Sequence, residues 1–108
     1  MSFKKINKVR DALLKVSSNV WHYEAMGKTD KYIVWAEDME GGSVHGDGKK
    51  LEQAIQGTID YFTKEEGDPT VDRIQEALNG ASIQFELSSV QYEEETGFIH
   101  YEWIWEVA

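Results

Sequence analysis

The segment Ile99-His100-Tyr101-Glu102-Trp103-Ile104-Trp105-Glu106-Val107 sets a large apolar side chain at every second position. Successive side chains of a β-strand point to opposite faces, so this alternation predicts a strand with both tryptophans on one face. Residues 83–92 alternate in the same way, and Glu94-Glu95-Thr96-Gly97 between the two runs has the composition of a turn. Together these residues predict an antiparallel β-hairpin.

The first run of this hairpin changes face midway. Its apolar positions are odd-numbered up to Leu87 and even-numbered afterwards. One extra residue in a strand moves every later side chain to the other face, so we expect a β-bulge near Ser88-Ser89. We also expect Gly97 to adopt a positive φ in the turn.

Two amphipathic segments lie outside this hairpin. Residues 3–16 carry apolar side chains at three- and four-residue intervals with lysines on the other side, which predicts a helix. Asp68-Pro69 predicts the start of a second helix, because an aspartate N-cap followed by proline is typical of a first turn. Gly80 marks the expected end of this helix.

The residues between the two helices favour strands. Residues 20–26 and 32–36 are rich in β-branched and aromatic side chains and flank a turn at 27–30, which predicts a hairpin. A second turn is expected at 38–42, and it leads to a short strand at 43–45.

Residues 50–64 fit a helix as well as a strand. Glycine costs about 1 kcal/mol inside a helix, and the residues after Gly57 are β-branched and aromatic, which favours a long strand from about Ala54. The predicted fold is therefore α+β, one domain over residues 1–108. It has an antiparallel sheet of about six strands with two helices packed on it, in the order α-β-β-β-β-α-β-β.

The charge of the chain is unevenly distributed. The formal net charge is −9, yet residues 1–16 hold five bases and one acid, so this segment is +4 and the remainder is −13. Binding to phosphate backbones needs clustered lysine and arginine, so sequence-specific nucleic-acid binding is not expected. No run approaches the ~18 apolar residues of a membrane span, and we expect no membrane partner.

Known catalytic patterns are missing from the sequence. There is no cysteine, no Gly-x-Ser-x-Gly elbow, and the glycines before Lys49 do not have the spacing of a phosphate-binding loop. We therefore expect no enzymatic activity, no catalytic residue and no cofactor. His22-Tyr23-Glu24 and His100-Tyr101-Glu102 could each direct two ligands to one strand face, but they are also what a half-buried strand shows to solvent. We favour the second interpretation and predict no metal site.

Two groups of residues are candidates for subunit contacts. Trp103 and Trp105 favour core packing, with an oligomer interface as the alternative, because tryptophan is enriched at interfaces. Lys4, Lys5 and Lys8 lie on the polar face of the first helix, where they could meet an acidic surface of a neighbouring subunit.

Three stretches carry a resemblance to a known family. They are Tyr92-Glu93-Glu94-Glu95-Thr96-Gly97-Phe98-Ile99-His100, Asp68-Pro69-Thr70-Val71-Asp72 and Tyr32-Ile33-Val34-Trp35. In this order of elements the chain resembles the small tail-terminator, or tail-completion, proteins of long-tailed bacteriophages and prophages. The resemblance implies a structural protein, commonly a hexameric ring, that caps the tail tube.

The resemblance also implies partners and a location. The partners are other copies of the chain, the tail tube protein and the head-tail connector or head-completion proteins. The protein would be made in the cytoplasm of a bacterial host and end in the virion tail. The acidity leaves an alternative function open, an inhibitor or immunity-type module that blocks a basic nucleic-acid enzyme.

Overall fold

The computed structural model describes residues 3–27, 30–46 and 49–108. The described residues form two α-helices and five strands, with a 3₁₀ turn before the first helix. In chain order they are η1 (Phe3–Ile6), α1 (Asn7–Leu14), β1 (Val20–His22), β2 (Lys31–Gly46), β3 (Lys49–Thr63), α2 (Thr70–Gly80), β4 (Gln84–Glu93) and β5 (Phe98–Val107).

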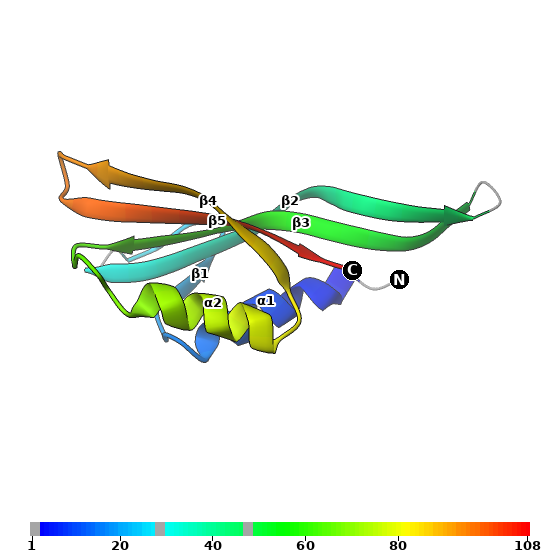
Figure 1. Cartoon of the computed structure of the whole chain (residues 1–108), viewed down its shortest axis with the longest axis horizontal. Helices are drawn as coiled ribbons and strands as arrows, with labels where there is room; N and C mark the ends of the chain where they lie inside the picture. The colour runs from blue at the N-terminus through cyan, green and yellow to red at the C-terminus, as the bar shows by residue number, and fades with distance from the viewer. Residues whose placement is uncertain (1–2, 28–29, 47–48) are drawn as a thin grey trace.

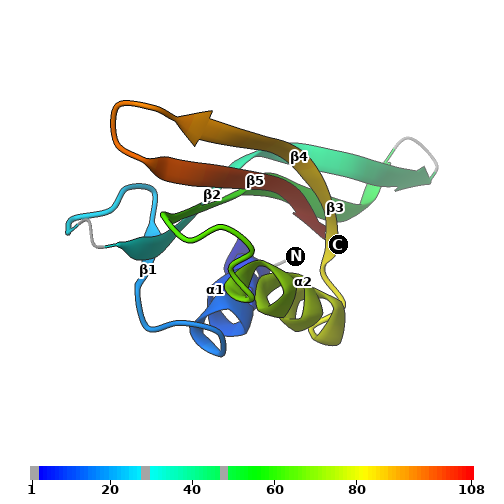
Figure 2. The same cartoon turned by 60° about the vertical axis from the view of Figure 1, so that its left-hand side comes forward.

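The five strands form one sheet in the order β1-β2-β3-β5-β4, and both helices cover the same face of it (Figures 1 and 2). This arrangement confirms the α+β class. The molecule is elongated, 52 × 25 × 24 Å, because the β2–β3 hairpin and the β4–β5 hairpin project at opposite ends (Figure 1). Since β5 pairs with β3 only as far as Ile55, the part of β3 before this residue extends beyond β5.

The predicted turn at residues 38–42 is wrong, and this lowers the strand count from six to five. β2 is a continuous strand of 16 residues whose pairing with β3 runs from Lys31↔Thr63 to Gly46↔Lys49. The register shifts three times along this ladder, including once between Glu40 and Ser43. The glycines at positions 41 and 42 therefore lie in a bulged strand, where extra residues are absorbed without reversing the chain.

The hairpin predicted for residues 20–36 is also wrong. β1 is short and runs parallel to β2, with Val20 opposite Ile33 and His22 opposite Trp35. Tyr23 has a φ of 74°, a left-handed conformation that ends the strand directly after His22. The loop that follows must return the chain to the same end of the sheet before β2 begins.

The helices follow their predicted patterns closely. Ile6, Val9 and Leu13 of the first stripe are buried, whereas Phe3, the first residue of the 3₁₀ turn, is half exposed. The predicted start of the second helix is confirmed: α2 begins at Thr70, and the Thr70 amide donates to Asp68 Oδ1 over 2.9 Å, although Pro69 rather than Asp68 directly precedes the helix.

The ambiguous segment around Gly57 is a strand. A Cβ at this position would lie 2.0 Å from the Ala36 carbonyl oxygen and 2.4 Å from Trp105 Cζ2. Glycine is therefore needed here because a backbone and an indole ring both approach closely. The bulge expected near Ser88-Ser89 is confirmed by a register shift between Leu87 and Ser89.

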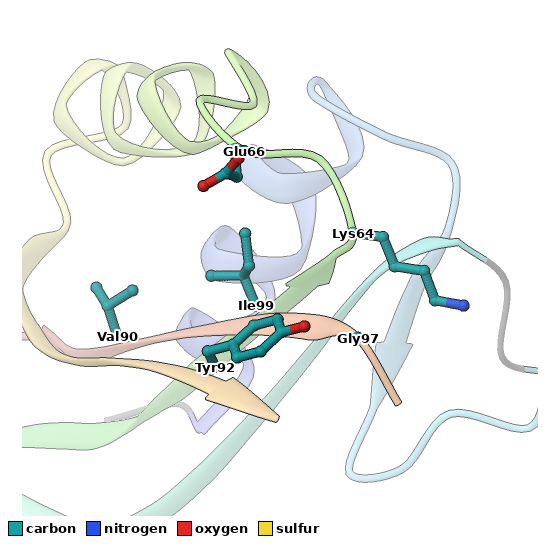
Figure 3. A pocket seen from close by; sticks show the side chains of 6 residues that line it. All are labelled: Lys64, Glu66, Val90, Tyr92, Gly97 and Ile99. Carbon is teal, nitrogen blue, oxygen red and sulfur yellow. The ribbon is translucent and has the colours of Figure 1, made fainter. Parts of the chain in front are cut away.

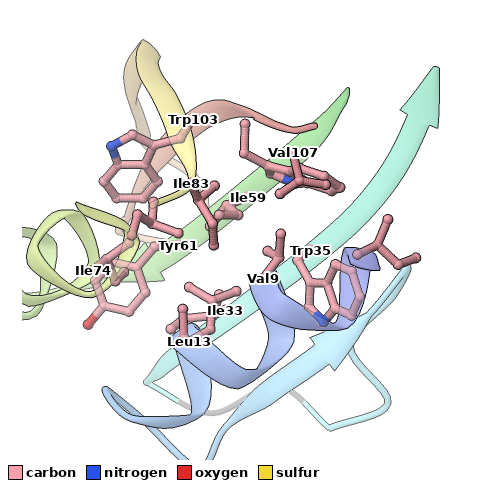
Figure 4. Close-up of a cluster of buried hydrophobic side chains, with 14 of the residues drawn as sticks. Val9, Leu13, Ile33, Trp35, Ile59, Tyr61, Ile74, Ile83, Trp103 and Val107 are labelled. Atoms are coloured by element: carbon pink, nitrogen blue, oxygen red, sulfur yellow. The ribbon is translucent and has the colours of Figure 1, made fainter. Parts of the chain in front are cut away.

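The core lies between the two helices and the sheet face that they cover (Figure 4). Its largest fully buried side chains are Trp35, Trp103, Trp105 and Tyr61. Burial of large apolar side chains is the main stabilising contribution to such a fold, at roughly 1.5–3 kcal/mol for each aliphatic or phenylalanine side chain.

Candidate interaction surfaces

The two tryptophans proposed as interface residues belong to the core. Trp103 and Trp105 are both fully buried within a single chain. The Trp103 indole N–H donates to Gln75 Oε1 over 3.1 Å, and that of Trp105 donates to the Thr58 carbonyl over 2.9 Å. Since both the rings and their N–H groups already have partners, neither residue is available to another subunit, and core packing is the correct interpretation.

The three lysines lie on the surface of the N-terminal helical segment. Lys4 and Lys8 are exposed, whereas Lys5 is half-buried and donates to the Gln53 carbonyl of β3. Lys8 Nζ also lies 3.5 Å from the Ser82 carbonyl. The structure therefore confirms the location of these lysines at the surface, but Lys5 also ties the helix to the sheet.

These lysines share a shallow groove with a fourth base. The groove has a volume of about 390 Å³ and is lined by Lys4, Lys5, Asn7, Lys8, Asp11, Ala12, Lys15 and Ala81. We call this surface the lysine groove. Four of its eight lining residues are lysines and one is acidic, so its local charge is strongly positive.

A second surface lies where the β4–β5 hairpin extends past the helices (Figures 1 and 3). Leu87, Val90 and Tyr92 are 44%, 51% and 65% exposed, although they pair with residues on the helix-covered side of β5. We call these three residues the apolar row. Val90 and Tyr92 lie towards the turn of the hairpin, whereas Leu87 lies on the edge strand opposite the buried Trp103.

The apolar row borders an open cavity. The cavity has a volume of about 610 Å³ and is lined by Lys64, Glu66, Val90, Tyr92, Gly97 and Ile99 (Figure 3). β4 is also the outermost strand of the described sheet, so one side of its backbone has no neighbouring strand there. Exposed strand edges of this kind are sites at which other chains add to a sheet.

The tip of this hairpin is acidic. Glu94 and Glu95 are exposed in the turn, and Glu93 at the end of β4 is half-buried. The turn is held by the Gly97 amide, which donates to the Glu93 carbonyl over 2.8 Å, and Gly97 has the predicted positive φ, 79°. We call Glu93, Glu94 and Glu95 the acidic turn.

His100 lies on the helix-free face of the sheet among carboxylates. Its Nε2 lies 2.6 Å from Asp60 Oδ1, and its Nδ1 lies 3.9 Å from Glu93 Oε2. The hydrogen bond with Asp60 raises the pKa of His100 above its usual value, against the opposing effect of burial. Ser88 Oγ donates to Glu102 Oε1 over 2.8 Å, which directs this carboxylate within the same cluster.

Asp60, His100 and Glu102 each offer one ligand atom within 4.8 Å of the others. The sequence pattern placed His100 with Glu102 but missed Asp60. Asp60 lies 40 residues from His100 in the sequence, and the two residues meet only because β3 pairs with β5. Hydrogen bonds within the cluster already engage His100, and we retain the expectation that no metal binds here.

The other histidine pair does not form a common face. The strand ends at His22, so Glu24 is not its neighbour on a β-strand. His22 Nε2 instead lies 2.7 Å from Glu37 Oε1. Burial would raise the pKa of Glu37, but hydrogen bonds with Tyr23 and His22 outweigh it and lower the pKa from its usual value.

The comparisons with known proteins found a likeness among solved structures. No protein-family model matches the chain, and no curated protein matches it. Among solved structures, the chain is similar to one described as the virion of a native gene transfer agent particle, with a TM-score of 0.59 and 12% sequence identity. The alignment covers 91% of this chain and 88% of that chain. At this identity the likeness concerns the fold, and it extends over nearly the whole of both chains.

The described helices are short. None of them is long and apolar enough to cross a membrane.

Proposed function

We propose that this chain is a structural protein of a phage or prophage tail. It caps the tail tube as an oligomeric ring and joins the tube to head-completion proteins. The observation that carries this proposal is the whole-chain likeness in fold to a component of a virion particle. The sequence resemblance to tail-terminator proteins supports the same function through the order of elements and the final hairpin.

The surface of the chain supports assembly with other subunits. The apolar row and the open edge of β4 are exposed at one end of the elongated molecule, and the β2–β3 hairpin projects at the other. A head-to-tail contact uses two different surfaces of each subunit, and it closes into a ring when the rotation between neighbours divides a full turn. Such a contact would cover surfaces that a monomer leaves in water.

The experiment that tests this function is electron microscopy of the purified protein combined with its mass in solution. We expect annular particles of uniform diameter in negative stain and a mass that is a fixed multiple of the chain mass. In the phage or prophage that encodes it, deletion of the gene should give tails that fail to join heads. A chain that stays monomeric at every concentration and binds a basic nuclease tightly would instead support the inhibitor function.

A further inference from the structure

The chain carries two surfaces of opposite charge, a basic groove and an acidic projecting turn. The lysine groove is concave and basic, and it is built on η1 and α1. The acidic turn is the tip of the projecting β4–β5 hairpin, and its Glu94 and Glu95 are exposed. Opposite charges at facing surfaces favour association and fix its orientation, and their effect is strongest where water is partly excluded.

We propose that the acidic turn of one copy docks into the lysine groove of the next copy. This proposal rests on the ring function proposed above and names the surfaces that would form each subunit contact. Each copy presents one turn and one groove, so the contact is heterologous and can repeat around a ring.

The charges of the two surfaces indicate that the lysine groove binds a second copy of the chain. The groove has Lys4, Lys8 and Lys15 as exposed bases, and its one lining acid, Asp11, is already paired with Arg10 over 2.9 Å. Glu66, in the segment between β3 and α2, lines the cavity beside the hairpin together with Lys64. The basic groove and the acidic turn therefore carry opposite charges within one sequence, so a second copy of the chain can supply the partner surface.

Apolar groups accompany the charges on both sides. Beside the acidic turn lies the apolar row, with Tyr92 65% exposed. On the helical segment that forms the groove, Phe3 and Leu14 are 50% and 48% exposed. Docking of the turn would bring the row towards this segment, so that burial of apolar surface adds to the attraction between charges.

Charge reversal tests the contact on each side separately. One variant is Lys4→Glu with Lys8→Glu, which leaves Lys5 and its bond to the sheet intact. The other is Glu94→Lys with Glu95→Lys. We expect each variant alone to raise the apparent dissociation constant of assembly at least about tenfold in sedimentation velocity, because every contact then opposes like charges.

Mixing the two variants is the decisive measurement. In a 1:1 mixture the acidic groove of the first variant can meet the basic turn of the second, and the basic groove of the second can meet the acidic turn of the first. Every contact of an alternating ring then joins opposite charges, so we expect assembly to return towards the wild-type constant. A matched control, Glu24→Lys with Glu76→Lys, changes the net charge as much as the turn variant at two exposed sites outside both surfaces. It should assemble like the wild type, and circular dichroism should show that all variants remain folded.

Three outcomes overturn the inference. If the wild type forms rings and both reversal variants assemble equally well, the contact is wrong while the ring function stands. If the variants fail alone and also fail when mixed, the two surfaces do not face each other. If the wild type is monomeric at every concentration, the proposed ring and this contact both fail.

Discussion

Asp68 is the residue on which the start of α2 depends most. Its side chain is fully buried and accepts hydrogen bonds from the Thr70 amide and, over 2.5 Å, from the Tyr61 hydroxyl. Lys31 Nζ lies 3.4 Å from the same carboxylate. Burial would raise the pKa of Asp68, but the hydrogen bonds, led by that from Tyr61, outweigh it and hold the pKa well below its usual range.

We expect Asp68→Ala to lower the free energy of unfolding by about 2–4 kcal/mol, because it removes the side-chain acceptor of the Thr70 amide and leaves the buried Tyr61 hydroxyl without its acceptor. Chemical denaturation at neutral pH measures this. Asp72→Ala, in the exposed first turn of the same helix, is the matched control and should cost much less. A loss below about 1 kcal/mol for Asp68→Ala would contradict this role.

The depressed pKa of Asp68 also predicts the response to acid. The unfolded chain protonates an aspartate near pH 4, whereas the folded chain holds Asp68 ionised to lower pH. The stabilisation is therefore present above the unfolded pKa and is lost as the pH falls through the folded pKa. We expect the difference in stability between the wild type and Asp68→Ala to shrink below about pH 4, and a constant difference would contradict the linkage.

His100 should show the opposite dependence on pH. Its pKa is raised in the folded chain, mainly by Asp60, so the stabilisation is complete below the unfolded value of about 6.5 and is lost as the pH rises through the folded pKa. We expect NMR titration of the imidazole to give a lower pKa in Asp60→Asn than in the wild type. Equal values in the two proteins would show that Asp60 is not the main cause.

At the scale of elements, the sequence predicted what depends on local pattern. α2, the β4–β5 hairpin, its bulge and the positive φ of Gly97 all follow from side-chain periodicity or from one residue's backbone preference. The errors lie in β1 and β2. Gly41 and Gly42 suggest a turn, but neither has a positive φ among the described backbone angles, and the pairing of Glu40 and Ser43 with β3 on either side keeps the chain in a strand.

The surfaces were predictable only in part. The lysines follow from helical periodicity, because a polar stripe opposite a buried one must face solvent. The burial of Trp103 and Trp105 depends on which face of the sheet the helices cover. The alternation of side chains along β5 places both residues on one face but does not identify the face that the helices cover. The exposure of the apolar row depends on the position of β4 at the edge of the sheet, which no local pattern in this strand specifies.

The turn of the β4–β5 hairpin provides a test of element geometry. Gly97 has a φ of 79°, which costs a residue with a Cβ about 1 kcal/mol or more. We expect Gly97→Ala to lower the stability by this amount in thermal or chemical denaturation. Gly80→Ala, at the end of α2 where a Cβ would meet nothing within 4 Å, should be neutral or stabilising. Equal effects would show that backbone strain does not act at position 97.

At the scale of the whole molecule, the distribution of charge is the property that assembly would use. The basic helical segment and the acidic remainder are parts of one chain, so neighbouring copies can attract through unlike surfaces even though each carries a net charge of −9. Long-range repulsion between copies falls with salt, and so does attraction between the two surfaces. The net effect of salt therefore shows whether repulsion between copies or attraction between the two surfaces governs assembly.

We expect assembly of the wild type to weaken as sodium chloride rises from 0.15 to 1 M, because the screening length falls from about 8 to about 3 Å. Sedimentation velocity across this range gives the slope of the assembly constant against salt. The assembly constant of the Lys4→Glu, Lys8→Glu variant should depend less on salt, or rise with it, because its groove and the acidic turn of the next copy are both negative. Tyr92→Ser should weaken assembly by a similar factor at every salt concentration, since it removes apolar contact and leaves the charges unchanged. If the association constant of the wild type instead rises with salt, charge repulsion between copies dominates and apolar contacts hold the ring.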